Sequence, residues 1–135
     1  MFSARALCRS GFLAAAIAVA SLFSFPSRAD AVYEYEADLY SYYGYLYSYY
    51  AYYDEYYYAD EYYYESYYWA YYGNLYAAYA YETFDDYWFY DAATYHYYAY
   101  LYSEWLANAY GGTYSYYASV YNYYAYIYCY YAYYY

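Results

Sequence analysis

The sequence predicts an all-α protein in which three or four Tyr-rich helices pack through a seam of small residues, as a thin bundle or a self-assembling layer. Three observations predict this fold. A seven-residue unit recurs along residues 32–135, its small residues fall alternately three and four apart, and the last Pro of the chain is Pro26. Spacing of three and four places side chains on one face of an α-helix. A stretch without Pro permits long helices.

The repeat has the form Tyr-Tyr-small-x-aliphatic-Tyr-small. Its copies are YYGYLYS (42–48), YYGNLYA (71–77), YYAYLYS (97–103), YYASVYN (116–122) and YYAYIYC (123–129). On a helix this unit makes a narrow seam of small side chains bordered by phenol rings, with the aliphatic residue on the far side. Such a seam lets two helix backbones come close, although it lacks the large apolar knobs of an ordinary coiled coil.

The seam residues fall into four series whose phase changes from one to the next. The series are Ser41, Gly44, Ser48 and Ala51; Ser66, Ala70, Gly73, Ala77 and Ala80; Ala92, His96, Ala99 and Ser103; and Ser115, Ala118, Asn122, Ala125, Cys129 and Ala132. Because the phase changes, we expect several helices rather than one. We place them near 34–72, 74–81, 86–109 and 114–134, with the first two either separate or continuous.

Local signals place the helix ends. Gly111 and Gly112 read as a helix end, and Thr113 as the N-cap of the next helix. Thr83 reads as another N-cap, followed by acidic residues in the first turn. Residues 73–74, a Gly-Asn pair, indicate a weaker break.

Two alternatives to the helical fold stay open. Tyr favours strands more than helices, and residues 105–135 are neutral and free of Pro, which is the profile of a cross-β segment. A β-rich or cross-β assembly is therefore one alternative, and a largely disordered low-complexity chain is the other. A transmembrane β-barrel is disfavoured, because its strands alternate strictly and the Tyr-Tyr pairs break the alternation.

Residues 1–31 differ from the rest and are typical of a cleaved secretory signal peptide. They hold all three basic residues and no Tyr, and an apolar run at 11–25 precedes Pro26 and a small-x-small cleavage pattern ending at Ala31. The run is shorter than the roughly 20 residues of a membrane-spanning helix. We therefore expect an exported protein, secreted, periplasmic or on the cell surface, whose Tyr-rich acidic repeat region is 32–135.

The net charge of residues 32–135 limits the classes of partner that this region can bind. This region holds all 45 Tyr, no Lys or Arg, and every acidic residue of the 14 except Asp30. Nucleic acids and anionic membranes are disfavoured, because both are bound through Lys and Arg. The expected partners are further copies of the chain, cations or basic proteins.

Side chains for catalysis are scarce, so we expect no enzymatic activity. Residues 32–135 contain one His and one Cys, and no Cys/His cluster of zinc spacing. The metal-ligand candidates are Asp54, Tyr58, Glu61 and Glu65, which share a helix face at spacings of four, three and four, and His96 on the seam. Carboxylate and phenolate oxygens suit Ca or Fe ions. No resident cofactor is otherwise expected.

Phenols are the abundant chemistry of this chain. Two neighbouring tyrosyl radicals couple to dityrosine, and rings three or four residues apart on a helix are neighbours. We therefore expect an exported structural protein that self-assembles and is fixed by oxidative Tyr cross-linking. The cross-linking candidates are Tyr116, Tyr117, Tyr123, Tyr124, Tyr130 and Tyr131, with Cys129 either a bridge between chains or a small packing residue. The alternative is a cation-binding or redox-active module that uses the acidic clusters and phenols.

Overall fold

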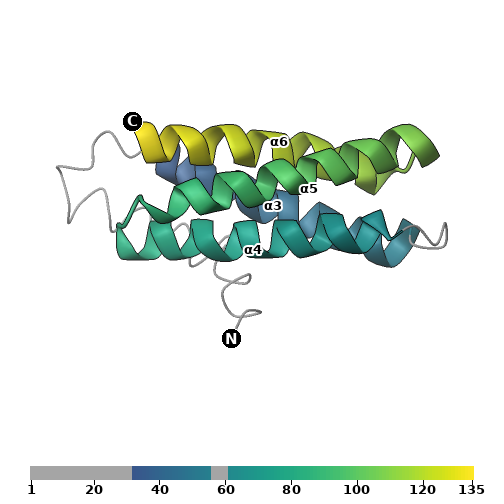
Figure 1. The fold of residues 1–135 in the computed structure, drawn as a ribbon, viewed down its shortest axis with the longest axis horizontal. Coiled ribbons are helices and arrows are strands. Elements are labelled where there is room, and N and C mark those ends of the chain that lie inside the picture. Colours follow the sequence, from purple (N-terminus) through teal and green to yellow (C-terminus); the bar gives the residue numbers. More distant parts are fainter. Residues whose placement is uncertain (1–31, 56–60) are drawn as a thin grey trace.

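Four α-helices form an antiparallel bundle in the computed structural model, which describes residues 32–55 and 61–135 (Figure 1). The helices are α3 (Val32–Glu55), α4 (Tyr62–Thr83), α5 (Trp88–Tyr110) and α6 (Thr113–Tyr134). No strand occurs in the described part of the chain, so the all-α prediction is confirmed and the β-rich and disordered alternatives are not supported. The predicted signal peptide, residues 1–31, lies outside the described residues.

The helices follow one another around the bundle, and α6 packs against α3 to close the ring. Ring contacts give the direction of the α3–α6 pair, because Tyr33 meets Tyr131 and Tyr47 meets Tyr117. Neighbouring helices are thus antiparallel, as short connections require. None of the described helices combines the length and the apolar character needed to cross a bilayer.

The seam of small residues faces the inside of the bundle. Every residue of the four series is buried, and none of the Ala and Ser side chains among them is more than 3% exposed. The aliphatic residues of the repeat lie on the outer side, half-buried or exposed, at Leu46, Leu75, Leu101, Val120 and Ile127. The core is therefore built mainly from Ala, Ser and Gly, and the larger side chains surround it.

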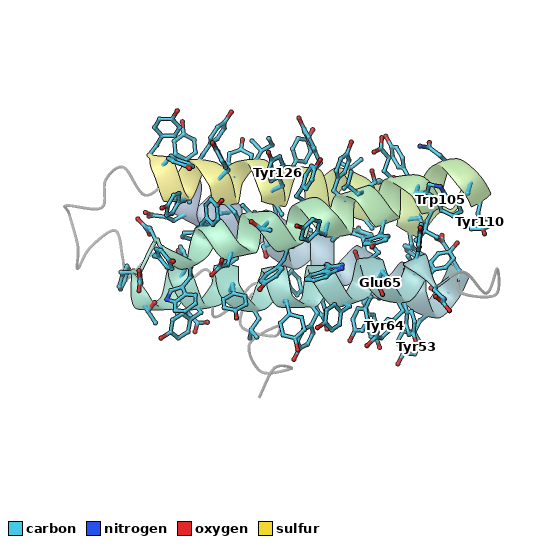
Figure 2. All side chains as sticks on the ribbon, viewed as in Figure 1. Tyr53, Tyr64, Glu65, Trp105, Tyr110 and Tyr126 are labelled. Carbon is cyan, nitrogen blue, oxygen red and sulfur yellow. The ribbon has the colours of Figure 1, made fainter. Side chains whose placement is uncertain are left out.

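Tyr rings close the grooves between neighbouring helices (Figure 2). Between α3 and α6, the ring of Tyr47 stacks on that of Tyr121 with centroids 5.3 Å apart and planes 11° apart. Tyr40 covers the same groove further along, 5.2 Å from Tyr128. Each such pair adds about 0.5–1.5 kcal/mol beyond the apolar area it buries. The rings thus supply the apolar cover that the small seam residues cannot.

The predicted helix boundaries between 34 and 81 are wrong. Residues 34–72 do not form one helix, because α3 ends at Glu55 and α4 begins at Tyr62. Residues 73–74 lie inside α4, where Gly73 is buried against the imidazole of His96. The Gly serves close packing rather than a helix end, and residues 56–60 lack the Gly or Pro that usually signals a break.

The two short turns lie where the sequence predicts them, but some of the capping residues differ from the prediction. Gly111 ends α5 in the left-handed conformation, with φ of 71° and its N–H donated to the Ala107 carbonyl, as predicted. Thr113 is the first residue of α6 rather than its N-cap.

Thr83 is the last residue of α4 rather than the N-cap of α5. Its hydroxyl donates back to the Tyr79 carbonyl at 2.7 Å, within the last turn of α4. Phe84 takes the left-handed position that ends α4, with φ of 58°. The N-cap of α5 is Tyr87, and Oδ1 of Asp85 accepts its N–H at 3.3 Å in the turn before the helix.

We expect Gly73→Ala to destabilise the protein, although Ala usually stabilises a helix interior by about 1 kcal/mol relative to Gly. A Cβ at this position would lie 2.6 Å from Cδ2 and 2.7 Å from Nε2 of His96. Overpacking of this kind costs about 1–3 kcal/mol, which urea unfolding measures. The control is the same change in a His96→Ala background, where the clash is gone and the added methyl group should stabilise the helix. Stabilisation in both backgrounds would contradict this packing.

Candidate functional site

A buried polar network lies at the centre of the bundle, around His96 of α5. The Nδ1 atom of His96 lies 2.8 Å from Oδ1 of Asn122, and its Nε2 atom lies 2.6 Å from the hydroxyl of Ser41. An amide oxygen only accepts hydrogen bonds, so Nδ1 carries the proton of the neutral ring. The unprotonated Nε2 then accepts the hydroxyl proton of Ser41.

Asn122 of α6 extends the network to the remaining helices. Its Nδ2 donates to the hydroxyl of Ser48 at 3.0 Å and reaches the carbonyl of Gly44 at 3.5 Å. The hydroxyl of Ser66 in α4 donates to Ser48 at 3.3 Å. Gly44 leaves room for the amide, because a Cβ there would lie 2.5 Å from Oδ1 of Asn122. The network therefore joins all four helices through buried hydrogen bonds.

His96 is neutral at physiological pH. Burial lowers its pKa from 6.5 to about 4, and the hydrogen bond to Asn122 opposes this only in part. Both ring nitrogens are engaged by a hydroxyl and an amide. The imidazole thus holds a fixed tautomer and orientation between Ser41 and Asn122.

The predicted carboxylate face does not form one helical surface. Asp54 lies in the last turn of α3, Glu61 precedes α4, and Glu65 lies in the first turn of α4. Tyr58 lies outside the described residues. Within the ranges that the structure describes, no three His, Cys, Asp or Glu side chains gather closely enough to hold a metal ion. The prediction of one carboxylate face requires a single helix that contains all four candidates. Because α3 ends at Glu55, that helix does not exist.

Glu55 is a site residue that the sequence analysis missed. Its buried carboxylate caps the N-terminus of α6, where Oε2 accepts the N–H of Tyr114 at 2.9 Å and Oε1 accepts the N–H of Ser115 at 3.1 Å. The hydroxyl of Ser115 donates to Oε1 at 2.6 Å. A carboxylate at this end of a helix satisfies free N–H groups and complements the helix dipole. Gly112 allows it, because a Cβ there would collide with the carboxylate.

Cys129 is fully buried on the seam of α6, beside Ala37, Phe89 and Ala132. Burial raises the pKa of its thiol well above the usual value, and the nearby Asp38 raises it further. A buried thiol with a raised pKa is a poor nucleophile. A bridge between chains through Cys129 would require the bundle to open, so the packing role agrees with its position.

The six cross-linking candidates on α6 all lie at the surface. Their side chains are between 38% and 57% exposed, at Tyr116, Tyr117, Tyr123, Tyr124, Tyr130 and Tyr131. Nearby rings approach closely, because Tyr130 lies 4.5 Å from the exposed Tyr134 between centroids, and Tyr116 lies 5.5 Å from Tyr117. Accessible, adjacent phenols are the arrangement that oxidative coupling needs.

Comparison with known proteins adds no relative. No protein-family model matches the chain, and neither a curated protein nor a solved structure matches it. The function is therefore argued from the residues and their geometry.

We expect the stability of the protein to fall as the pH is lowered from about 6.5 to about 4. The folded pKa of His96 is lowered, so the unfolded chain binds more protons over this window. The difference between the folded and unfolded pKa values corresponds to a loss of about 3 kcal/mol, complete near pH 4.

The measurement is urea unfolding at several pH values, compared with His96→Gln. Carboxylates titrate in both proteins, so the difference between the two pH profiles isolates the imidazole. We expect the variant to lose the imidazole part of the slope, whatever its stability at neutral pH. Parallel profiles would show that His96 is not buried as a neutral ring.

We expect Glu55→Gln to destabilise the protein by about 1–2 kcal/mol, because the cap of α6 loses its charge and one acceptor oxygen. The amides of Tyr114 and Ser115 should exchange hydrogen faster in the variant. Asp54→Asn is the matched control, since Asp54 is the exposed neighbour in the same turn. Its effect should stay within about 0.5 kcal/mol. Equal losses in the two variants would exclude a specific cap.

Proposed function

We propose that this protein is an exported structural protein that associates with copies of itself through its tyrosine surface and is fixed by oxidative coupling between tyrosines. The observation that carries the proposal is the outer face of α6. This helix has no charged residue, yet its six cross-linking candidates are exposed. Export rests on the predicted signal peptide at residues 1–31.

Charge distribution supports α6 as the meeting surface. All acidic residues of 32–135 lie before residue 105, and α3, α4 and α5 each carry some of them. Two copies that meet through these helices bring like charges together, whereas two α6 faces do not. Tyr is enriched at protein interfaces, because its ring buries apolar area while its hydroxyl still finds a partner.

The sequence predicts self-association through both the small-seam helices and the Tyr surfaces. The seam residues are buried within one bundle, which leaves the Tyr surfaces for contact between copies. Contact between copies therefore falls to the outer rings. Half-buried phenols such as Tyr45 are also less accessible to a second chain than the exposed rings of α6.

The coupling step needs an oxidant, for which hydrogen peroxide with a peroxidase is the chemical class. Each of two phenols loses one electron and one proton, and the two radicals join through a new carbon–carbon bond ortho to the hydroxyls. Each ring then loses its ortho hydrogen as it regains aromaticity, while the phenolic protons return. In total two tyrosines and one peroxide give one dityrosine and two waters.

A second candidate function is one-electron transfer, favoured by a column of rings between α4 and α5. Trp69 stacks on Tyr95 at 5.5 Å, Tyr95 contacts Tyr76 at 5.4 Å, and Tyr76 stacks on Trp88 at 5.5 Å. A one-electron oxidant would remove an electron from one Trp, and the neighbouring rings of this column would then supply an electron to replace it. A module of this kind passes its oxidising equivalents to a reductant without gaining dityrosine, so peroxidase treatment separates the two functions.

We expect peroxidase and hydrogen peroxide to produce dityrosine fluorescence and covalent dimers of the protein. Changing the six α6 candidates to Phe keeps the rings and removes the oxidisable hydroxyls, so most of the dimers should disappear. The matched control changes six exposed tyrosines of α4 and α5 to Phe: Tyr62, Tyr64, Tyr68, Tyr79, Tyr97 and Tyr98. Denaturing gels should show dimers retained in this control. Equal loss in both variants would reject α6 as the meeting surface, and no dityrosine in the unchanged protein would reject the coupling.

A further inference from the structure

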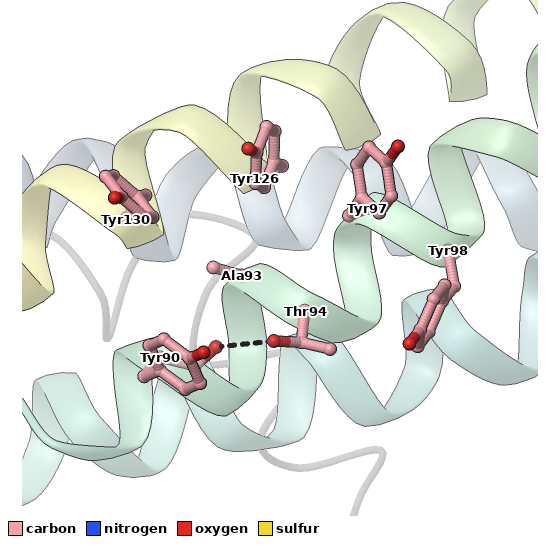
Figure 3. A pocket seen from close by; sticks show the side chains of 7 residues that line it. All are labelled: Tyr90, Ala93, Thr94, Tyr97, Tyr98, Tyr126 and Tyr130. Atoms are coloured by element: carbon pink, nitrogen blue, oxygen red, sulfur yellow. Dashed lines mark hydrogen bonds between the residues drawn. The ribbon is translucent and has the colours of Figure 1, made fainter.

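A groove between α5 and α6 is lined almost entirely by Tyr rings (Figure 3). Its volume is about 320 Å³. Tyr90, Tyr97 and Tyr98 come from α5, and Tyr126 and Tyr130 come from α6. Ala93 lies among them and is only 3% exposed, so its small side chain leaves the space that the rings surround.

Ring contacts between the two helices bound the groove along its length. Tyr97 meets Tyr126 with centroids 5.2 Å apart, seven residues along α5 from Tyr90. Tyr90 meets Tyr133 of α6, also at 5.2 Å. Because α5 and α6 are antiparallel, these two contacts stand on opposite sides of Ala93. The groove therefore lies between these two ring contacts, and we call it the cage below.

The lining offers ring faces and no charged group. Thr94 is its one aliphatic hydroxyl, and this hydroxyl donates to the carbonyl of Tyr90 at 3.2 Å, as the dashed line in Figure 3 shows. No carboxylate lines the groove, so a metal ion would find too few of the oxygen ligands that it prefers. A ligand for this cage must gain from aromatic faces.

The negative charge of the chain favours a ligand with a positive charge. Residues 32–135 contain no Lys or Arg, and all acidic residues but Asp30 belong to them, so the surrounding field attracts cations. The face of a Tyr ring is electron-rich and attracts a cation that lies over it, most effectively when the cation is weakly hydrated. A trimethylammonium group carries charge, has an apolar surface and donates no conventional hydrogen bond.

We propose that the groove between α5 and α6 binds the trimethylammonium group of a small organic cation. The four rings of Tyr90, Tyr97, Tyr126 and Tyr130 surround the cation, and Ala93 lies beneath it. The proposal does not depend on the cross-linking function, although Tyr130 belongs to both sites, and it is tested on protein that has not been oxidised.

The test is titration of the purified protein with choline, followed by NMR of the Ala93 and Thr94 methyl groups and by calorimetry. The comparison ligand is 3,3-dimethyl-1-butanol, the neutral isostere of choline. We expect saturable shifts of both methyl groups with choline and binding at least about tenfold weaker for the isostere. Shifts spread over tyrosines of the whole surface, without saturation at Ala93, would overturn the proposal, as would equal binding of the isostere.

Variants of Tyr97 test whether choline binding depends on the aromatic ring or only on the net charge of the chain. Tyr97→Leu keeps the net charge and most of the bulk but removes a ring face, so choline binding should weaken by about tenfold or more. Tyr97→Phe keeps the face and should bind as the unchanged protein does. Tyr116→Leu is the matched control, since Tyr116 is exposed on α6 away from the groove. Equal weakening at Tyr97 and Tyr116 would overturn the proposal.

Phosphatidylcholine vesicles distinguish the source of the group. Retention of the protein on these vesicles that free choline competes away identifies a lipid headgroup as the ligand. Saturable choline binding without vesicle retention identifies a free cation. Both results support the cage, and absence of both overturns it.

Discussion

The small size of the core side chains is the constraint on which this structure depends. Ala, Ser and Gly on the inner faces allow the facing helices to pack closely. Such side chains bury little apolar area, so the core alone provides little of the hydrophobic stabilisation. The remainder must come from groups that cover the close-packed backbones from outside. Tyr suits this position, because its ring reaches across a groove between helices while its hydroxyl remains near water. The abundance of Tyr is thus a consequence of the narrow core.

A narrow core built from near-identical repeats raises a second problem, which is the choice of register. Sliding one helix by seven residues would place small residues against small residues and rings against rings again. The polar network removes this degeneracy, because the imidazole of His96 fits only beside Gly73, and Asn122 fits only beside Gly44. A slipped helix would bury these polar groups without partners, which is costly. One polar layer that fixes register at the expense of stability is well known in coiled coils, and the same logic applies here.

The sequence predicted the features that follow from local periodicity. It was less useful for features that depend on residues of other helices. The seam residues from Ser41 to Ala132 were correctly placed on the inner faces, because spacings of three and four act within each helix. The helix end at Gly111 was also readable, because it depends on the conformation of one residue. Gly73 was wrongly predicted to be a helix break, because the side chain that requires a Gly there, His96, lies on another helix. The capping role of Glu55 was missed, because its partners Tyr114 and Ser115 lie about sixty positions away in the sequence. The end of α3 has no local signal of Gly or Pro.

The separation of charge along the chain limits how copies can assemble in the proposed function. An uncharged α6 beside three acidic helices gives the bundle one face that meets its own copy without repulsion. Two copies that meet through the same face form a closed pair, because each surface is then used up. Growth into a layer needs a second surface, and the exposed tyrosines of α3, α4 and α5 lie on helices that carry carboxylates. Neutralisation of those carboxylates by cations or by a basic partner would bring these rings together. In the proposed function, the acidic residues therefore limit assembly, and the tyrosines supply the contacts between copies.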